Sequence, residues 1–132
     1  MNNIQIEPKS EKIMTSLDSK VITQLREMIG EEEFEEVFAD LMNAYLEDTP
    51  KLIQGLVNGL KNEDRQEIKI NAHTLKSSSE SLGAMKLSQL SKEVEHCMIK
   101  GNLKKPTILI PQILEEYNKV ENLMRQELSK LN

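Results

Sequence analysis

Residues 65–83 read RQEIKINAHTLKSSSESLG, and this stretch decides how the chain folds. An ideal helix turns by about 100° per residue, so residues of this stretch can be placed around a wheel. Five of them fall within one narrow arc: Ile68, Ala72, Leu75, Ser79 and Leu82. We predict that this arc enters a core and that Gly83 ends the helix. His73 lies roughly 140° from the arc, so we predict that it faces solvent.

The outward side of this helix carries His73 with four polar residues: Lys69, Lys76, Ser77 and Glu80. Ile70 is the exception, because it is apolar and lies one turn before His73. A partner that brings a reactive group to an imidazole needs an apolar contact surface around the polar centre. We therefore predict partner docking at three residues of this side: Ile70, Lys69 and Glu80.

The residue types around His73 suit phosphoryl transfer. A neutral imidazole is nucleophilic near physiological pH, and the phosphorus–nitrogen bond that it forms stays reactive. Lys76, one turn later, can neutralise charge on a phosphoryl group through its ammonium. Ser77 and Ser78 are small, so they leave the approach to the ring open and can donate hydrogen bonds. A histidine on a helix is usually structural or merely solvated, and these neighbours are what favour a phosphoacceptor.

The rest of the chain also shows apolar residues at helical spacing, and no stretch alternates as a strand would. The pattern predicts helices over these residues: 18–30, 31–48, 50–60, 65–82, about 87–100, and 111–131. Asp18 and the polar segment 61–64 offer N-caps, and Gly30 is a suitable end for the first helix. Thr49 and Pro50 predict a break, because Thr can cap a new helix and Pro fits its first position.

Apolar stripes predict which side of each helix is buried. The stripe of the helix over 31–48 consists of Phe34, Val37, Phe38, Leu41 and Tyr45. The stripe of the helix over 50–60 consists of Leu52, Ile53, Leu56, Val57 and Leu60. Met42 and Leu46 lie off the main arc, which leaves open whether they contact a partner.

Consecutive amphipathic helices joined by short turns pack most simply side by side and antiparallel. We therefore expect an all-α protein: an antiparallel four-helix bundle, with the short first helix lying across it. Residues 1–16 show no sustained period and are expected to form a flexible N-terminal arm. Residues 17–132 then make one helical domain.

Composition argues against several classes of function. Only 3% of the 132 residues are aromatic, so an aromatic-lined pocket for a small molecule is hard to build and we expect no cofactor. The chain has two histidines and one cysteine, and their spacing matches no metal-binding motif, so we expect no metal site. The net charge is −5 and the lysines are dispersed, which argues against nucleic acid. The sequence has no signal-peptide pattern and no membrane-spanning apolar run, so we expect a cytoplasmic protein.

The segment Ala72-His73-Thr74-Leu75-Lys76-Ser77-Ser78-Ser79, followed by Leu82-Gly83-Ala84, resembles the signature of histidine-phosphotransfer domains. The resemblance covers about residues 18–130. It implies that His73 is the phosphoacceptor and Lys76 its charge partner, with Ser78 and Glu95 near the ring. Glu95 would accept a hydrogen bond from the second ring nitrogen, although the sequence alone allows it to be a plain surface carboxylate. Ser77 departs from the family pattern, which usually has glycine there.

The resemblance also implies a function. Such modules carry a phosphoryl group without catalytic apparatus of their own, so we expect a phosphorelay carrier and not an enzyme. The expected partners are receiver domains of a hybrid histidine kinase and of a response regulator, which bring the aspartate and a magnesium ion. We expect the carrier itself to be a monomer. A non-catalytic adaptor that binds a receiver or kinase domain is the alternative, but an adaptor would be expected to lose His73 or Lys76.

Overall fold

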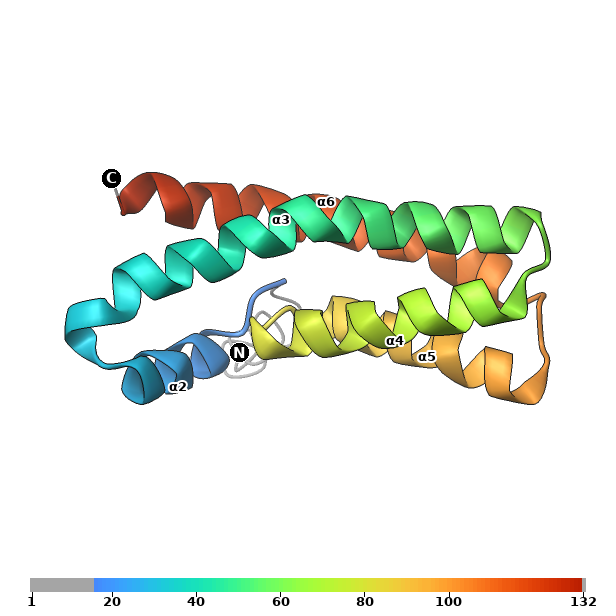
Figure 1. The fold of residues 1–132 in the computed structure, drawn as a ribbon, viewed down its shortest axis with the longest axis horizontal. Coiled ribbons are helices and arrows are strands. Elements are labelled where there is room, and N and C mark those ends of the chain that lie inside the picture. Colours follow the sequence, from blue (N-terminus) through green and yellow to red (C-terminus); the bar gives the residue numbers. More distant parts are fainter. Residues whose placement is uncertain (1–15, 132) are drawn as a thin grey trace, which may run out of the picture.

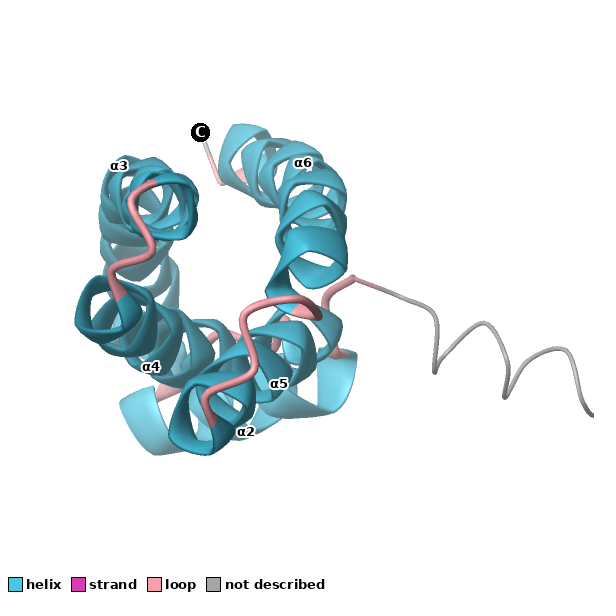
Figure 2. Cartoon of the chain, turned by 90° about the vertical axis from the view of Figure 1, so that its right-hand side faces the viewer, coloured by secondary structure: helices cyan, strands magenta, loops and turns pink. Residues whose placement is uncertain are grey.

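The computed structural model describes residues 16–131, and these form five α-helices. Their bounds are α2 (Ser19–Ile29), α3 (Glu31–Lys61), α4 (Arg65–Ser81), α5 (Met85–Lys100) and α6 (Pro106–Lys130). Helices α3 to α6 form an antiparallel four-helix bundle (Figure 1), and each packs against the next around a closed ring (Figure 2). The predicted fold class is confirmed. The predicted N-terminal arm lies outside the described residues apart from Ser16, which is buried.

The short helix α2 lies beside the first half of α3, beyond the end of α4, and not across the bundle as expected (Figure 1). The Asp18 side chain accepts a hydrogen bond from the Lys20 backbone N–H at 2.8 Å, so Asp18 is the N-cap of α2, as predicted. The Asp18 backbone N–H also donates to the Gly83 carbonyl at 2.8 Å. Gly83 has a φ of 86°, and a Cβ there would lie 3.1 Å from the Asp18 carbonyl oxygen. Glycine therefore allows the end of α4 to meet the start of α2.

Pro50 lies inside α3, so the prediction of two helices over 31–48 and 50–60 is wrong. Proline removes one helical hydrogen bond and crowds the preceding turn, at a local cost of about 3 kcal/mol. Figure 1 shows that α3 bends near its middle and then continues. Leu46 and Ile53, on either side of Pro50, are both buried in the same core. We attribute the continuous helix to this packing, which the local pattern around Pro50 does not reveal.

The last helix begins at Pro106 and not near Pro111 as predicted. The Asn102 side-chain oxygen accepts hydrogen bonds from the backbone N–H groups of Lys104 and Lys105, at 3.0 and 3.4 Å. This turn leads the chain into the helix, and Pro106 occupies its start, where a missing N–H costs nothing. Pro111 lies in the second turn of α6 and does not end it.

The buried side of α3 differs from the predicted stripe. Met42 and Leu46 are core residues, so the suggestion that they contact a partner is wrong. Leu41, predicted to be buried, is 40% exposed, and Val57 is 36% exposed. The reason is that α3 packs against both α4 and α6, so its buried side follows the positions that face these two helices together. The buried residues of α3 are Phe34, Phe38, Met42, Tyr45, Leu46, Thr49, Ile53, Leu56 and Gly59.

Two glycines bring α3 close to α4. A Cβ on Gly59 would lie 2.7 Å from Cγ1 of Ile68, which is closer than van der Waals contact allows. A Cβ on Gly55 would overlap the side-chain amide of Asn71. Asn71 lies two residues before His73, so these glycines set the distance between the helices next to the predicted site.

We predict that Gly59→Ala lowers the free energy of unfolding by about 1–3 kcal/mol, because the fully buried Ile68 and the α4 backbone cannot move aside. Gly55→Ala is the matched comparison and should cost less, because the Asn71 amide is the end of a side chain that can swing away. Urea unfolding of both variants measures the difference. Equal stability of Gly59→Ala and the natural chain would contradict the close approach.

Candidate functional site

The core arc predicted for α4 is buried in the structure, and this fixes the outward direction of His73. Ile68, Ala72, Leu75 and Ser79 each have no exposed surface, and Leu82 at the end of the helix is also buried. The side chain of His73, on the opposite side of the helix, is 58% exposed. A second protein can therefore reach the imidazole from solvent.

Glu95 joins the two predicted site residues of α4 from the neighbouring helix α5. Its Oε2 lies 2.8 Å from Nδ1 of His73, and its Oε1 lies 3.2 Å from Nζ of Lys76. The side chains of Glu95 and Lys76 are only 16% and 26% exposed. One carboxylate thus holds both the ring and the ammonium in place, and Glu95 is not a plain surface residue.

The protonation of Glu95 determines the tautomer of His73. Partial burial acts to raise the pKa of Glu95, but the hydrogen bonds and charges of His73 and Lys76 outweigh it and lower the pKa. A carboxylate can only accept hydrogen bonds, so Nδ1 must be the nitrogen that carries the proton. Nε2 then holds the lone pair, and among the described residues it has no hydrogen-bond partner. The arrangement makes Nε2 the nucleophilic atom of the ring.

Small residues on α5 bring Glu95 within reach of α4. Ala84, before the helix, and Ser88 and Ser91 within it are all buried. The Ser88 hydroxyl donates a hydrogen bond to the Lys76 carbonyl at 2.9 Å, which ties the two helices together at the site. Sequence reasoning missed Ser88. Its only signal was a polar residue beside the apolar Leu87.

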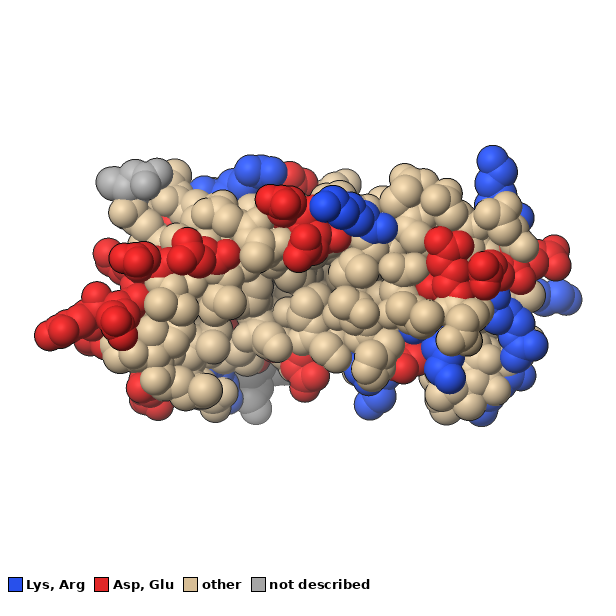
Figure 3. Space-filling view, viewed as in Figure 1, with Lys and Arg blue, Asp and Glu red and all other residues tan. Residues whose placement is uncertain are grey.

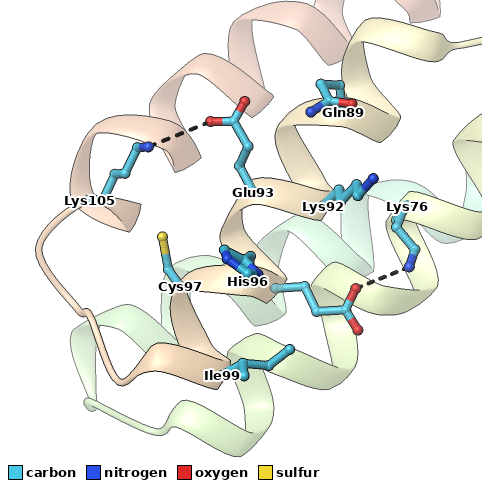
Figure 4. A pocket seen from close by; sticks show the side chains of 9 residues that line it. Lys76, Gln89, Lys92, Glu93, His96, Cys97, Ile99 and Lys105 are labelled. Atoms are coloured by element: carbon cyan, nitrogen blue, oxygen red, sulfur yellow. Dashed lines mark ion pairs between the residues drawn. The ribbon is translucent and has the colours of Figure 1, made fainter.

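A pocket of about 530 Å³ adjoins the Lys76–Glu95 ion pair on the side of α5 (Figure 4). His96 is exposed and lines this pocket. A second ion pair, Lys105 to Glu93 at 4.0 Å, lies across the pocket from Lys76. Cys97 is buried apart from 7% of its surface, as expected for a small hydrophobic residue.

A mostly apolar groove of about 350 Å³ lies on the other side of α4, towards α2 and α3. Leu25, Leu41 and Leu52 line it together with Thr74 and Ser78 of α4. Tyr45 also lines the groove, and its hydroxyl forms a hydrogen bond of 2.6 Å with the hydroxyl of Ser79. Burial raises the pKa of Tyr45 to about 12, so its hydroxyl stays protonated and links α3 to α4.

The remaining predicted site residues lie in different surroundings. Ile70 is 55% exposed on the same side as His73, and Lys69 and Ser77 are exposed as well. The Ser78 hydroxyl donates to the Leu75 carbonyl at 3.4 Å, away from the ring. Glu80 lines a different pocket beside α2, two turns from His73.

Charged side chains are unevenly distributed over the surface. On the face shown in Figure 3, acidic side chains gather at the end where α3 begins, and basic ones lie mostly towards the other end. The acidic end includes the exposed residues Glu27, Glu31, Glu32, Glu33, Glu35, Glu36 and Asp40. Within residues 16–131, no three His, Cys, Asp or Glu side chains gather in a way that could hold a metal ion. None of the described helices is long and apolar enough to span a bilayer.

Comparison with known proteins gives a consistent result. The family model for the Hpt domain matches residues 40–130 of the chain. The crystal structure of histidine-containing phosphotransfer protein B from Pseudomonas aeruginosa PAO1 is similar, with a TM-score of 0.79 and 28% sequence identity. The match covers 89% of this chain and 97% of that one. No curated protein matches the sequence.

The lowered pKa of Glu95 predicts a pH-dependent contribution to stability. The ionised carboxylate is favoured in the folded state, so its contribution is complete above the ordinary pKa of 4.5 and disappears as pH falls through the lower folded value. We predict that Glu95→Ala is less stable than the natural chain at pH 7 and that the gap narrows below pH 4.5. Urea unfolding across this range measures the gap. A gap of constant size would mean that the ion pairs of Glu95 do not stabilise the fold.

Proposed function

The chain belongs to the Hpt domain family, and on that premise we propose that it accepts a phosphoryl group on Nε2 of His73 and passes it on. The observation that carries the proposal is the exposed imidazole whose Nδ1 is hydrogen-bonded to Glu95. This bond leaves the lone pair on Nε2, which points the nucleophile away from the carboxylate. Residues 17–132 act as one module in this proposal.

The donor and acceptor in the proposed reaction are aspartates of receiver domains. Nε2 attacks the phosphorus of an aspartyl phosphate, a phosphorus–nitrogen bond forms, and the phosphorus–oxygen bond breaks with its electron pair left on the aspartate. Transfer to a second receiver reverses these steps. As the resemblance to histidine-phosphotransfer domains implies, the receiver would bring the magnesium ion. The partners would be the receiver of a hybrid kinase and that of a response regulator.

Lys76 supplies positive charge beside the reacting group. In the resting protein its ammonium is paired with Glu95, one helical turn from the ring. A transferring phosphoryl group carries negative charge on its equatorial oxygens, and a partly buried ammonium at this distance stabilises that charge. The same ammonium offsets the repulsion between the phosphoryl group and the Glu95 carboxylate.

The alternative function is an adaptor that binds a receiver domain without accepting phosphate. Such a protein would need the exposed face of α4 but not the hydrogen bond that the ring donates to Glu95. The orientation of His73 by a partly buried carboxylate favours the carrier, because solvated histidines need no such partner.

We predict that His73→Gln abolishes phosphoryl transfer from a phosphorylated receiver domain. The measurement is acid-labile, base-stable radiolabel on the chain after incubation with the receiver. His96→Gln is the matched control, because His96 is also an exposed histidine, on α5. Label that persists in His73→Gln and disappears in His96→Gln would place the acceptor at His96 and contradict the proposal. A chain that binds the receiver but never takes label would support the adaptor.

We predict that Lys76→Ala slows transfer by about tenfold to a thousandfold, because one charge near the transferring group is lost. The fold should survive, since the Lys76 side chain lies off the core of α4. Quenched-flow transfer kinetics and circular dichroism measure the two effects. A transfer rate equal to that of the natural chain would remove Lys76 from the mechanism.

A further inference from the structure

The first described helix, α2, is only partly covered by the rest of the chain. None of the 11 residues of Ser19–Ile29 is fully buried, although the helix lies beside α3. Ile22 and Ile29 pack against the edge of the core. An adjacent stripe of the same helix carries Val21 and Met28, and Met28 is 81% exposed. A helix usually buries its apolar residues, so this stripe offers a surface to a second protein.

The exposed stripe continues into a hollow beside the end of α4. Val21, Leu25 and Met28 line the hollow from α2, and Met85 lines it from the start of α5. Its volume is about 390 Å³. Exposed methionines suit a protein-binding surface, because their unbranched side chains adapt to the shape of a partner. Figure 1 shows α2 along an outer edge of the molecule, where a second molecule can reach it.

Two charged side chains flank the stripe. Lys20 and Glu27 each lie directly before one residue of the stripe, and they are 7 residues apart. Seven residues make almost two helical turns, so both charges lie along the same flank of α2. Both residues are exposed, and within residues 16–131 neither forms an ion pair. Two charges of opposite sign therefore remain available beside the exposed stripe.

The positions of these two charges do not help α2 itself. A helix carries partial positive charge at its N-terminus and partial negative charge at its C-terminus. Lys20 lies in the first turn of α2 and Glu27 in the last, so each meets a partial charge of its own sign. The stability of α2 explains neither residue, whereas a partner that offers the opposite charges would explain both.

We propose that the stripe and the hollow bind α2 of a second copy of this chain. Two copies of α2 can pack antiparallel about a twofold axis, with their exposed stripes in contact. Lys20 of each copy then faces Glu27 of the other copy, which gives two ion pairs across the interface. This dimer takes the place of the monomer that the sequence led us to expect. It goes beyond the proposed function and does not depend on it.

The contact is small, so the dimer is weak and dissociates on dilution. A standard protein interface takes about 20–30 residues from each partner, and one short helix with Met85 offers fewer. His73 stays available in the dimer, because the hollow is lined by the far end of α4, at Glu80 and Ser81. Each copy can therefore present its imidazole to another protein.

Sedimentation equilibrium of the full chain, from about 10 μM to about 1 mM, measures the association. We expect the average mass to rise with concentration from that of one chain towards that of two. Met28→Gln should weaken the association by about tenfold or more, because both copies bury this residue in the contact. Ile108→Gln is the matched control and should change nothing, since Ile108 is an exposed apolar residue of α6 outside the hollow. A chain that stays monomeric throughout this range, or grows beyond two copies, would overturn the proposal.

Exchange of the two charges tests the antiparallel pairing. Lys20→Glu and Glu27→Lys should each weaken the association by about tenfold, because each puts like charges opposite one another twice. Both substitutions favour α2 through its dipole, so loss of the helix does not account for a weaker dimer. The double variant restores opposite charges and should associate within about threefold of the natural chain. Single variants as strong as the natural chain, or a double variant no stronger than the singles, would overturn the pairing.

Discussion

The burial of one side of α4 is the constraint on which the rest of the structure depends. Ile68, Ala72 and Leu75 are fully enclosed, so the helix cannot rotate about its axis without exposing them. The glycines of α3 hold it on one side and the small residues of α5 hold it on the other. A helix fixed in this way presents its opposite side as a rigid surface, and His73 lies at the centre of that surface.

The bundle positions the histidine without enclosing it, and this suits a carrier. At this site the chain presents an exposed ring, one carboxylate and one ammonium. Glu95 and Lys76 serve different purposes. The carboxylate accepts a hydrogen bond from Nδ1 of the ring, and in the proposed transfer the ammonium compensates the charge of the phosphoryl group.

Much of the fold follows from local pattern, and the exceptions have a common cause. The arc of α4, the N-cap at Asp18 and the end at Gly83 depend on residues close in sequence, and all three were predictable. The continuation of α3 through Pro50 and the burial of Met42 were not predictable, because the packing of α3 on α4 and α6 decides both. Within the site, the exposure of His73 followed from the helical wheel. The family resemblance implied that Glu95 accepts a hydrogen bond from the ring, whereas the ion pair of Glu95 with Lys76 was not predicted, since it depends on how closely α5 approaches α4.

The central claim is that Glu95 occupies Nδ1 of His73 and leaves Nε2 as the atom that carries the phosphoryl group. The most direct test is to identify the phosphorylated nitrogen by ¹⁵N–³¹P coupling in the labelled protein after transfer from a receiver domain. The structure predicts that the phosphorus couples to Nε2. A phosphoryl group on Nδ1 would require the hydrogen bond to Glu95 to break, and it would contradict this account of the site.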